Sequence, residues 1–486
     1  MLKLNDPSLF KQQAYIAGAW VDADDAKTVA VTNPATGEQL GTVPMCGAAE
    51  TERAIAAADV AQRQWAQVPA KERAAVLRKL NDLMLANVDD LGLIMTSEQG
   101  KPLTEAKGEI AYAASFIEWF AEEARRIYGD TIPATSGDKR IVAIKQPIGT
   151  TAAITPWNFP TAMLTRKAGP ALAAGCSMVV KPATQTPYSA LAFALLAERA
   201  GVPKGLLSVL TGSASAIGGE MTRNPLVRKL TFTGSTEVGR TLMRQSADTI
   251  KKLSLELGGN APFIVFDDAD IDAAVDGAMI SKYRNTGQTC VCANRLYVQR
   301  GVVKAFTEKL VAKVKALKVG NGVEAGVTQG PLIDAKAVAK IEEHIADARA
   351  KGGEVLTGGK RHALGGLFFE PTVVGGATAG MLFAKEETFG PLAPIFAFDT
   401  EDEVIAQAND SEFGLAAYFY SRDIGRVMRV AERLESGIVG INTGLISTAE
   451  APFGGVKQSG LGREGSKYGL DDFLEIKYLC FGGIDK

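Results

Sequence analysis

The chain has 486 residues, of which 53 are Lys or Arg and 55 are Asp or Glu, so its formal net charge is −2. This near-balance argues against a nucleic-acid partner, which needs a basic surface. The 46% share of hydrophobic residues excludes a disordered chain. The first residues lack the apolar core of a signal peptide, and no apolar run is long enough to span a membrane. We therefore expect a cytoplasmic protein with no membrane partner.

In the first half of the chain, the spacing of apolar residues changes near residue 130. Residues 49–128 place apolar side chains at steps of three and four, which predicts helices, and Phe116, Trp119 and Phe120 are expected in the core. Residues 139–149 then alternate like an exposed strand, where Pro147 limits pairing in the middle of a sheet.

From residue 150 onward, strands and helices alternate in two series. The first series runs to residue 256 and the second from 261 to about 442, which predicts parallel sheets with right-handed crossovers. The expected fold is α/β, with two tandem Rossmann-like doubly wound domains. The closing segment, 471–481, alternates like a strand. We expect it to pair with the strand near 140 in a small β element whose exposed edge serves oligomerisation.

Cys290 lies in the strongest local signal of the chain, the segment NTGQTCVCANR at 285–295. Small polar residues follow a predicted helix there, so the backbone can turn and expose a thiol. Without further context, a free cysteine is more often a buried packing residue than a nucleophile. Cys290 and Cys292 could also form half of a metal site. No second CxxC motif or histidine cluster accompanies them, so we expect no metal.

A nucleophilic cysteine needs a base or a lowered pKa. His344 and His362, the only two histidines, lie in a polar helix and a glycine-rich loop, and we expect both on the solvated surface. A carboxylate must serve instead. Glu256 ends an apolar strand, and the carboxyl ends of parallel strands face the crevice where α/β proteins bind ligands. There its pKa would be raised and it could act as a base; the alternative is an exposed acid at a strand end.

Three further strand ends carry polar groups. Gly234 and Gly239 flank a strand-to-helix turn that is neither a P-loop nor G-x-G-x-x-G, although its helix N-terminus can face an anion. Lys181 ends a second strand and can bind a ribose hydroxyl or a phosphate. Asn158 follows a third strand, and an amide fixed beside a thiol suits an oxyanion hole. A plain turn role is the alternative for Asn158.

Seven segments together occur in the order seen in aldehyde dehydrogenases, which the chain resembles over essentially its whole length: TPWNFP, VVKPA, FTGSTEVG, LELGGNAPFIVFDDAD, GQTCVCANR, KEETFGP and PFGGVKQSGLGREG. Within that family it is most similar to bacterial succinate-semialdehyde dehydrogenases, with glutarate-semialdehyde dehydrogenases very close. The resemblance implies a cofactor-binding domain at 1–129 and 148–256 and a catalytic domain at 257–469. It also implies oligomerisation strands at 130–147 and 470–486.

The resemblance also implies the role of each site residue. Cys290 matches the nucleophile, Glu256 the general base, and Asn158 with the Cys290 backbone N–H the oxyanion hole. The residues that match the cofactor site are Trp157, Lys181, Thr184, Gly234, Ser235, Gly239, Glu387 and Phe389. The residues expected to hold the distal carboxylate of the substrate are Arg166, Arg284 and Ser447.

The expected activity is NAD(P)-dependent oxidation of succinate semialdehyde, as in GABA degradation, by a homodimer or homotetramer. Thr184 stands where NAD-preferring relatives often carry Glu; a threonine cannot repel a 2′-phosphate and can donate its hydroxyl. We therefore expect NADP, with NAD tolerated. The runner-up is glutarate semialdehyde or a broad aldehyde range, because one methylene is worth only ~1–3 kcal/mol of discrimination. The intact Cys290, Glu256 and Asn158 set argues against a noncatalytic relative, and the lack of a partner histidine argues against a cysteine esterase.

Cys292 raises the question of a redox switch. A residue two positions from Cys290 lies at the upper edge of disulfide reach. Cys290 is expected to be partly thiolate, which favours oxidation, and a Cys290–Cys292 disulfide would block it reversibly. The alternative is that an irregular loop turns Cys292 to the opposite face, as a packing residue.

Overall fold

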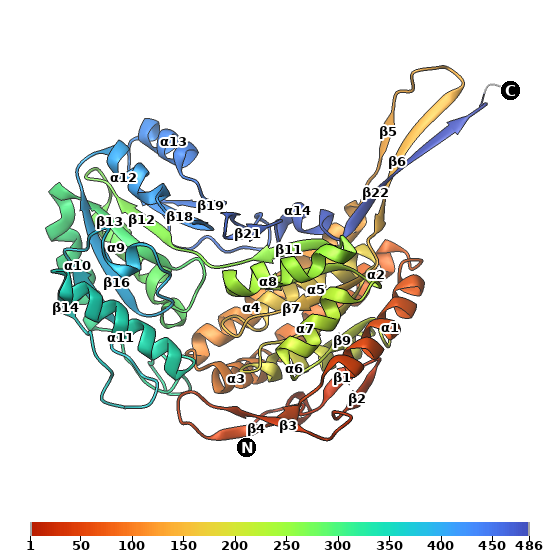
Figure 1. The fold of residues 1–486 in the computed structure, drawn as a ribbon, viewed down its shortest axis with the longest axis horizontal. Helices are drawn as coiled ribbons and strands as arrows, with labels where there is room; N and C mark the ends of the chain where they lie inside the picture. The colour runs from red at the N-terminus through yellow and green to blue at the C-terminus, as the bar shows by residue number, and fades with distance from the viewer. Residues whose placement is uncertain (1, 485–486) are drawn as a thin grey trace.

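The computed structural model describes residues 2–484. It contains two α/β units in succession along the chain, each built around its own sheet (Figure 1). The prediction of tandem parallel sheets is confirmed. Five parallel strands form the centre of the first sheet, in the spatial order β9-β8-β7-β10-β11. Their bounds are Thr150–Ile154 for β7, Ser177–Lys181 for β8, Leu207–Val209 for β9, Val227–Thr233 for β10 and Lys252–Glu256 for β11.

The order of these strands reverses between β7 and β10. β8 and β9 lie on one side of that point and β11 on the other, and β8 is buried at every residue, as expected for a strand covered on both faces. In such sheets ligands bind outside the carboxyl ends at the reversal. The connecting helices are α5 (Ala162–Ala174), α6 (Pro187–Ala200), α7 (Ala214–Arg223) and α8 (Thr236–Ser246).

The predicted helical region is present as four helices. They are α1 (Ala48–Trp65), α2 (Ala70–Ala86), α3 (Val88–Gln99) and α4 (Leu103–Glu123). Phe116 and Phe120 on α4 are fully buried and Trp119 is half-buried, so the predicted core position is correct for the two phenylalanines. The structure also contains four N-terminal strands that we did not predict: β1 (Ala14–Ile16), β2 (Ala19–Val21), β3 (Thr28–Thr32) and β4 (Gln39–Pro44).

The second sheet has the spatial order β14-β15-β16-β13-β12-β18-β19, and all of its pairings except β14–β15 are parallel. Its strands are β12 (Ala261–Val265), β13 (Ala293–Gln299), β14 (Glu354–Thr357), β15 (Thr372–Gly375), β16 (Leu392–Phe398), β18 (Ala416–Tyr420) and β19 (Ile438–Ile441). Its helices are α9 (Ile271–Tyr283), α10 (Val303–Lys315), α11 (Ala335–Ala350), α12 (Glu401–Asn409) and α13 (Ile424–Arg433). Among residues 2–484, no helix is both long and apolar enough to cross a bilayer.

The chain returns to the first sheet near its end. β21 (Gly460–Leu461) pairs antiparallel with β11, and Gly460 lies opposite Glu256. Part of the predicted catalytic range therefore contacts the first sheet beside the end of β11. The predicted domain ranges themselves stay predictions. The remaining short elements are β17 (Phe413–Gly414), β20 (Val456–Lys457) and α14 (Ser466–Asp471).

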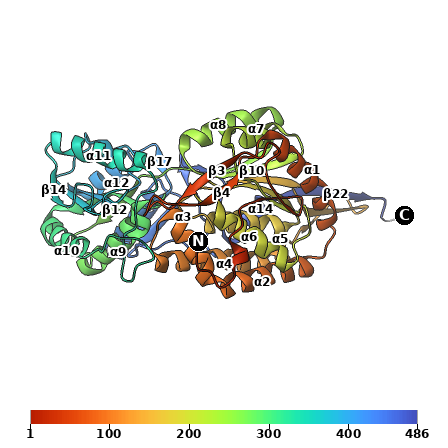
Figure 2. The same cartoon turned by 90° about the horizontal axis from the view of Figure 1, so that it is seen from below.

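A three-stranded arm projects from the body of the molecule (Figures 1 and 2). It consists of β5 (Asp130–Ile132), β6 (Lys139–Pro147) and β22 (Leu474–Gly482), in the order β22-β6-β5. The closing strand pairs with the strand near 140, as predicted. β6 is the central strand of the arm, and the predicted limit on central pairing holds at Pro147 itself. Pro147 is the last residue of β6, and β5 pairs only with residues 141–143, so the proline faces no second partner.

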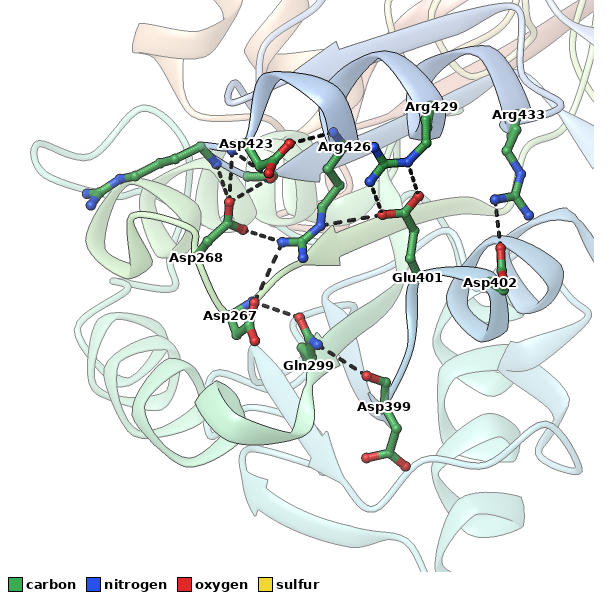
Figure 3. Close-up of polar contacts among 12 residues, drawn as sticks. Asp267, Asp268, Gln299, Asp399, Glu401, Asp402, Asp423, Arg426, Arg429 and Arg433 are labelled. Atoms are coloured by element: carbon green, nitrogen blue, oxygen red, sulfur yellow. Dashed lines mark hydrogen bonds and ion pairs between the residues drawn. The ribbon is translucent and has the colours of Figure 1, made fainter.

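Ion pairs connect α13 to α12 and to the loop that follows β12 (Figure 3). Arg426 donates to Asp268 at 2.7 Å, and Arg429 forms two hydrogen bonds of 2.9 Å with Glu401. Arg433 pairs with Asp402 at 2.7 Å. The three arginines recur at steps of three and four residues, so one face of the helix carries the whole network.

Candidate active site

A cavity of about 250 Å³ lies beside the point where the strand order reverses. Loops after β7 and β10 form one wall, and the segments around Cys290 and Glu387 form the other. Ten of the predicted site residues line it: Trp157, Asn158, Arg166, Gly234, Ser235, Arg284, Cys290, Glu387, Phe389 and Ser447. Tyr112 of α4 and Phe453 also line it, and we did not predict either.

Lys181, Thr184, Gly239 and Glu256 lie outside this lining. Lys181 ends β8 and is buried, with its Nζ 3.5 Å from Thr184 Oγ1, and burial lowers the pKa of Lys181 to about 8. Gly239 lies on α8, where a Cβ atom would meet the side chain of Leu257 at 2.5 Å. Gly239 therefore permits close helix packing rather than contact with the cavity.

Cys290 follows an unusual turn. Asn285, Thr286 and Gly287 have consecutive φ values of 51°, 56° and 74°, in the left-handed region. A Cβ atom on Gly287 would lie 2.2 Å from the carbonyl oxygen of Gly390, so glycine is required where this turn meets the segment carrying Phe389. The turn brings the half-buried Cys290 to the cavity wall.

The surroundings of Cys290 favour its neutral thiol form. Burial, the charge of Glu387 and the charge of Glu256 raise its pKa to about 12, although Arg166 and Arg284 act in the opposite sense. The expectation of a partly ionised thiol therefore does not hold here. The apolar, acid-rich surroundings outweigh the two arginines, so a base must take the proton before the sulfur can attack.

Asn158 is held with its amide nitrogen toward the Cys290 segment. Its Nδ2 donates to the carbonyl of Gln288 at 3.1 Å, and its Oδ1 accepts from the backbone N–H of Phe159 at 3.0 Å. Asn158 is 6% exposed and lines the cavity. A fixed N–H donor beside a thiol can stabilise negative charge on an oxygen that forms there.

Glu256 is a buried acid at the end of β11. It is 2% exposed, and neither carboxyl oxygen has a hydrogen-bond partner among residues 2–484. Burial and the nearby charge of Glu464 raise its pKa well above the usual value, while Arg166, Lys167 and Arg463 oppose the shift. A carboxyl in this environment can exchange a proton near neutral pH.

Arg166 is not a free cation in the cavity. Its guanidinium lies 2.8 Å from Glu464 and stacks 3.9 Å over the ring of Phe453. Lys167 forms an ion pair with the same carboxylate and donates to Thr233 Oγ1 at 2.6 Å. The sequence analysis missed Glu464 and Lys167. Adjacent cations inside the otherwise apolar helix 162–174 were the available signal.

His344 is buried, so its predicted surface position is wrong. The ring nitrogens lie 3.1 Å from Thr388 Oγ1 and 3.4 Å from Glu386 Oε2, beneath the segment that carries Glu387 and Phe389. His344 shares one face of α11 with the buried residues Ile341, Ile345 and Ala348. That apolar stripe was visible in the sequence, whereas the surrounding charges suggested a solvated helix. His362 is half-exposed in its loop.

Cys292 points away from the cavity. Its thiol donates to the carbonyl of Lys282 at 3.2 Å, and its backbone N–H closes a turn with Thr289 at 2.9 Å. Both Cys290 and Cys292 are free, and only Cys290 lines the cavity. The irregular loop is thus present, and a disulfide would require this turn to open. The reversible switch stays a prediction.

Within residues 2–484, no group of three or more His, Cys, Asp and Glu side chains has the arrangement of a metal site. The site combines a cysteine thiol, an amide donor and a buried carboxyl at the ligand-binding edge of a doubly wound sheet. At that edge, a thiol beside a fixed amide donor is suited to nucleophilic chemistry on a bound ligand.

Comparison with known proteins identifies the class more closely. The sequence matches the aldehyde dehydrogenase family over residues 20–479. It is 71% identical to glutarate-semialdehyde dehydrogenase of Pseudomonas aeruginosa, covering 99% of this chain and 100% of that protein. It is 67% identical to succinate-semialdehyde dehydrogenase [NADP(+)] of Escherichia coli, covering 99% and 100%.

A solved structure gives the same result. Succinate-semialdehyde dehydrogenase from Burkholderia pseudomallei superposes with a TM-score of 0.98 at 68% identity, with 99% of each chain covered. The chain belongs to the aldehyde dehydrogenase family. It is an aldehyde-oxidising enzyme that uses NAD or NADP.

Proposed function

We propose that this enzyme oxidises succinate semialdehyde to succinate, with NADP as the preferred hydride acceptor. The observation that carries the proposal is the cavity itself. It places two arginines and a serine hydroxyl, from Arg166, Arg284 and Ser447, in one space with Cys290 and Asn158. Such a space suits a short aldehyde with a carboxylate at its far end, because a guanidinium matches a carboxylate.

The residues around the cavity fit a nicotinamide dinucleotide. Ser235 caps the N-terminus of α8, where backbone N–H groups favour a phosphate. Within the described part of the chain, the buried ammonium of Lys181 makes a single hydrogen bond, of 3.5 Å to Thr184, so it is available to a ribose hydroxyl. Trp157 and Phe389 meet edge to face at 5.6 Å and would flank the nicotinamide. When bound, the cofactor would accept a hydride.

The residues of the chain divide the reaction between them. The Cys290 sulfur, once deprotonated, adds to the aldehyde carbon, and Asn158 Nδ2 stabilises the resulting alkoxide. Loss of hydride leaves a thioester on Cys290. Glu256 then takes a proton from water, whose oxygen attacks the thioester and releases the acid and the thiol. The buried, unbonded carboxyl oxygens of Glu256 support this role, since its raised pKa suits a base near neutral pH.

Comparison of a charged and an uncharged aldehyde with the parent and Arg284→Ala tests the substrate. Arg284 is less buried than Arg166 and makes no ion pair among the described residues, so its removal leaves no buried carboxylate alone. We expect KM for succinate semialdehyde to rise about 10-fold or more, with KM for butanal changed less than about 3-fold. Equal losses on both substrates would refute the carboxylate-binding role.

Glutarate semialdehyde is the second candidate substrate, favoured by the 71% identity to a protein of that name. The measurement that separates the two is kcat/KM for both semialdehydes under the same conditions. A higher value for glutarate semialdehyde would overturn the four-carbon assignment and leave the roles of Cys290, Glu256 and Asn158 intact.

The proposal includes a homo-oligomer formed through the arm. β22 lies at the edge of the arm and pairs only with β6 within the described chain. Ile476 and Tyr478 are 74% and 61% exposed on one face of that strand. A long edge with exposed apolar side chains favours pairing with a second copy.

A further inference from the structure

A buried ion pair contacts the backbone of Asn158. Lys101, between α3 and α4, is 2% exposed, and Glu109 of α4 is 3% exposed. Their charged groups are 2.5 Å apart. The Lys101 ammonium also donates to the backbone carbonyl of Asn158 at 2.7 Å and lies 3.9 Å from the centre of the Phe159 ring.

Glu109 holds the next part of the same loop. Its Oε1 accepts hydrogen bonds from the backbone N–H groups of Thr161 and Ala162, at 3.0 and 3.1 Å. These groups begin α5, where a carboxylate is also favoured by the helix dipole. Lys101 and Glu109 together therefore fix the backbone on both sides of Phe159.

The same network reaches the cysteine segment. Glu105, one turn before Glu109 on α4, accepts from the backbone N–H of Asn285 at 2.8 Å. The side-chain amide of Asn285 donates to the carbonyls of Asn158 and Gln288, each at 3.1 Å. One helix thus holds both the amide donor and the turn that leads to Cys290.

Burying this pair costs free energy that a surface position would avoid, and removing one partner leaves an unpaired buried charge. Neither Lys101 nor Glu109 lines the cavity, and we assign neither a contact with the substrate. Their bonds go instead to the peptide groups that set the position of Asn158. The arrangement is suited to holding an oxyanion donor in place before reaction.

We infer that Lys101, oriented by Glu109, is a positioning residue that holds Asn158 in place for alkoxide stabilisation. The inference rests on the proposed role of Asn158. A displacement of about 1 Å at a reacting group can lower the rate about 10²-fold, so a small relaxation of this loop is enough to be measured.

The test is a double-mutant cycle of Lys101→Met and Asn158→Ala in the full-length enzyme. We expect Lys101→Met to lower kcat about 10- to 100-fold, with little change in KM for NADP. In the Asn158→Ala background the same change should lower kcat less than about 3-fold, because Lys101 acts through the missing amide. The matched control is Lys107→Met, since Lys107 lies on α4 and pairs with Asp89 at the surface.

The possible results separate the two proposals. If Asn158→Ala alone leaves kcat unchanged, the proposed oxyanion role fails. If Asn158→Ala lowers kcat but the Lys101→Met loss is as large with and without Asn158, the positioning role fails. Should Lys101→Met not fold, Glu109→Gln replaces it in the cycle. That variant keeps its shape and its acceptor for Thr161, and the same non-additive loss is expected.

Discussion

Two ionisable groups set the chemistry at the scale of single residues. Burial raises the pKa of the Cys290 thiol to about 12 and holds the pKa of Glu256 well above its ordinary value. The raised pKa values favour the protonated form of both groups. Nucleophile and base must lose their protons before they can act, so turnover is coupled to pH.

Glu256→Gln should separate the two halves of the reaction. We expect a burst of reduced cofactor without steady turnover, because the amide cannot take a proton from water and the thioester persists. In the parent enzyme, steady turnover should rise with pH through the raised pKa of Glu256, since only the carboxylate is a base. Stopped-flow absorbance from pH 5 to 9 measures both. Full steady turnover in the variant would contradict the assignment.

Thr184→Glu should shift the preference from NADP toward NAD. Thr184 lies 3.5 Å from the buried ammonium of Lys181, beside the expected adenosine ribose. A carboxylate there would repel a 2′-phosphate and accept from ribose hydroxyls. The measurement is kcat/KM for both cofactors, with Thr184→Val as a control that removes the hydroxyl without adding charge. An unchanged ratio of the two kcat/KM values in the glutamate variant would contradict this interpretation.

Single residues also show where sequence reasoning stops. Cys290, Glu256 and Asn158 stand in short contiguous motifs, and each could be proposed from its own neighbourhood. Glu464 could not, because it meets Arg166 only after the chain returns to the first sheet through β21. The pKa shifts of Cys290 and Glu256 could not be predicted in full either, because they depend on burial and on charges distant in sequence.

At the scale of elements, regular patterns were predictable and short strands were not. Strands such as β8 read as apolar runs between turn residues, and helices of three turns or more show their period. β1 and β2 have three residues each, too few to show any period. They pair with each other, and β1 also pairs with β9, a contact distant in sequence.

The ion pairs of α13 should stabilise the second sheet unequally (Figure 3). Arg426 is 23% exposed and forms ion pairs with Asp267, Asp268 and Glu401. Arg433, by contrast, forms an ion pair with one described residue, the largely exposed Asp402. We expect Arg426→Met to lower the free energy of unfolding by about 1–3 kcal/mol. Arg433→Met, the control, should cost less than about 1 kcal/mol. Urea unfolding of both variants checks this, and equal losses would contradict it.

The same network predicts a pH dependence. Burial acts to raise the pKa of Asp268, but hydrogen bonds from Ser421 and two backbone N–H groups, with the charge of Arg426, lower it overall. A carboxylate with a lowered folded-state pKa stabilises the fold above its unfolded pKa and loses that effect as pH falls. The stability difference between parent and Asp268→Asn should therefore shrink below about pH 4.

At the scale of the whole molecule, the arm is the feature that has an open strand edge within the described chain. β22 extends from the body with nine residues paired to β6, and its other edge is open within residues 2–484 (Figure 1). The arm contains no residue that lines the active-site cavity. Its sequence alternation predicted a strand pair, and its exposed apolar side chains support the proposed oligomer.

Tyr478→Glu combined with Ile476→Glu should therefore prevent assembly while leaving the fold of each domain intact. Both side chains are on the exposed face of β22, so the new charges meet water in the monomer and an apolar surface in the oligomer. We expect light scattering to show a mass near 51 kDa, against a multiple of it for the parent. The control is Leu364→Glu, because Leu364 is 57% exposed in a loop of the second domain. An unchanged mass in the double variant would show that assembly does not depend on this strand, and a monomeric parent would overturn the proposed oligomer.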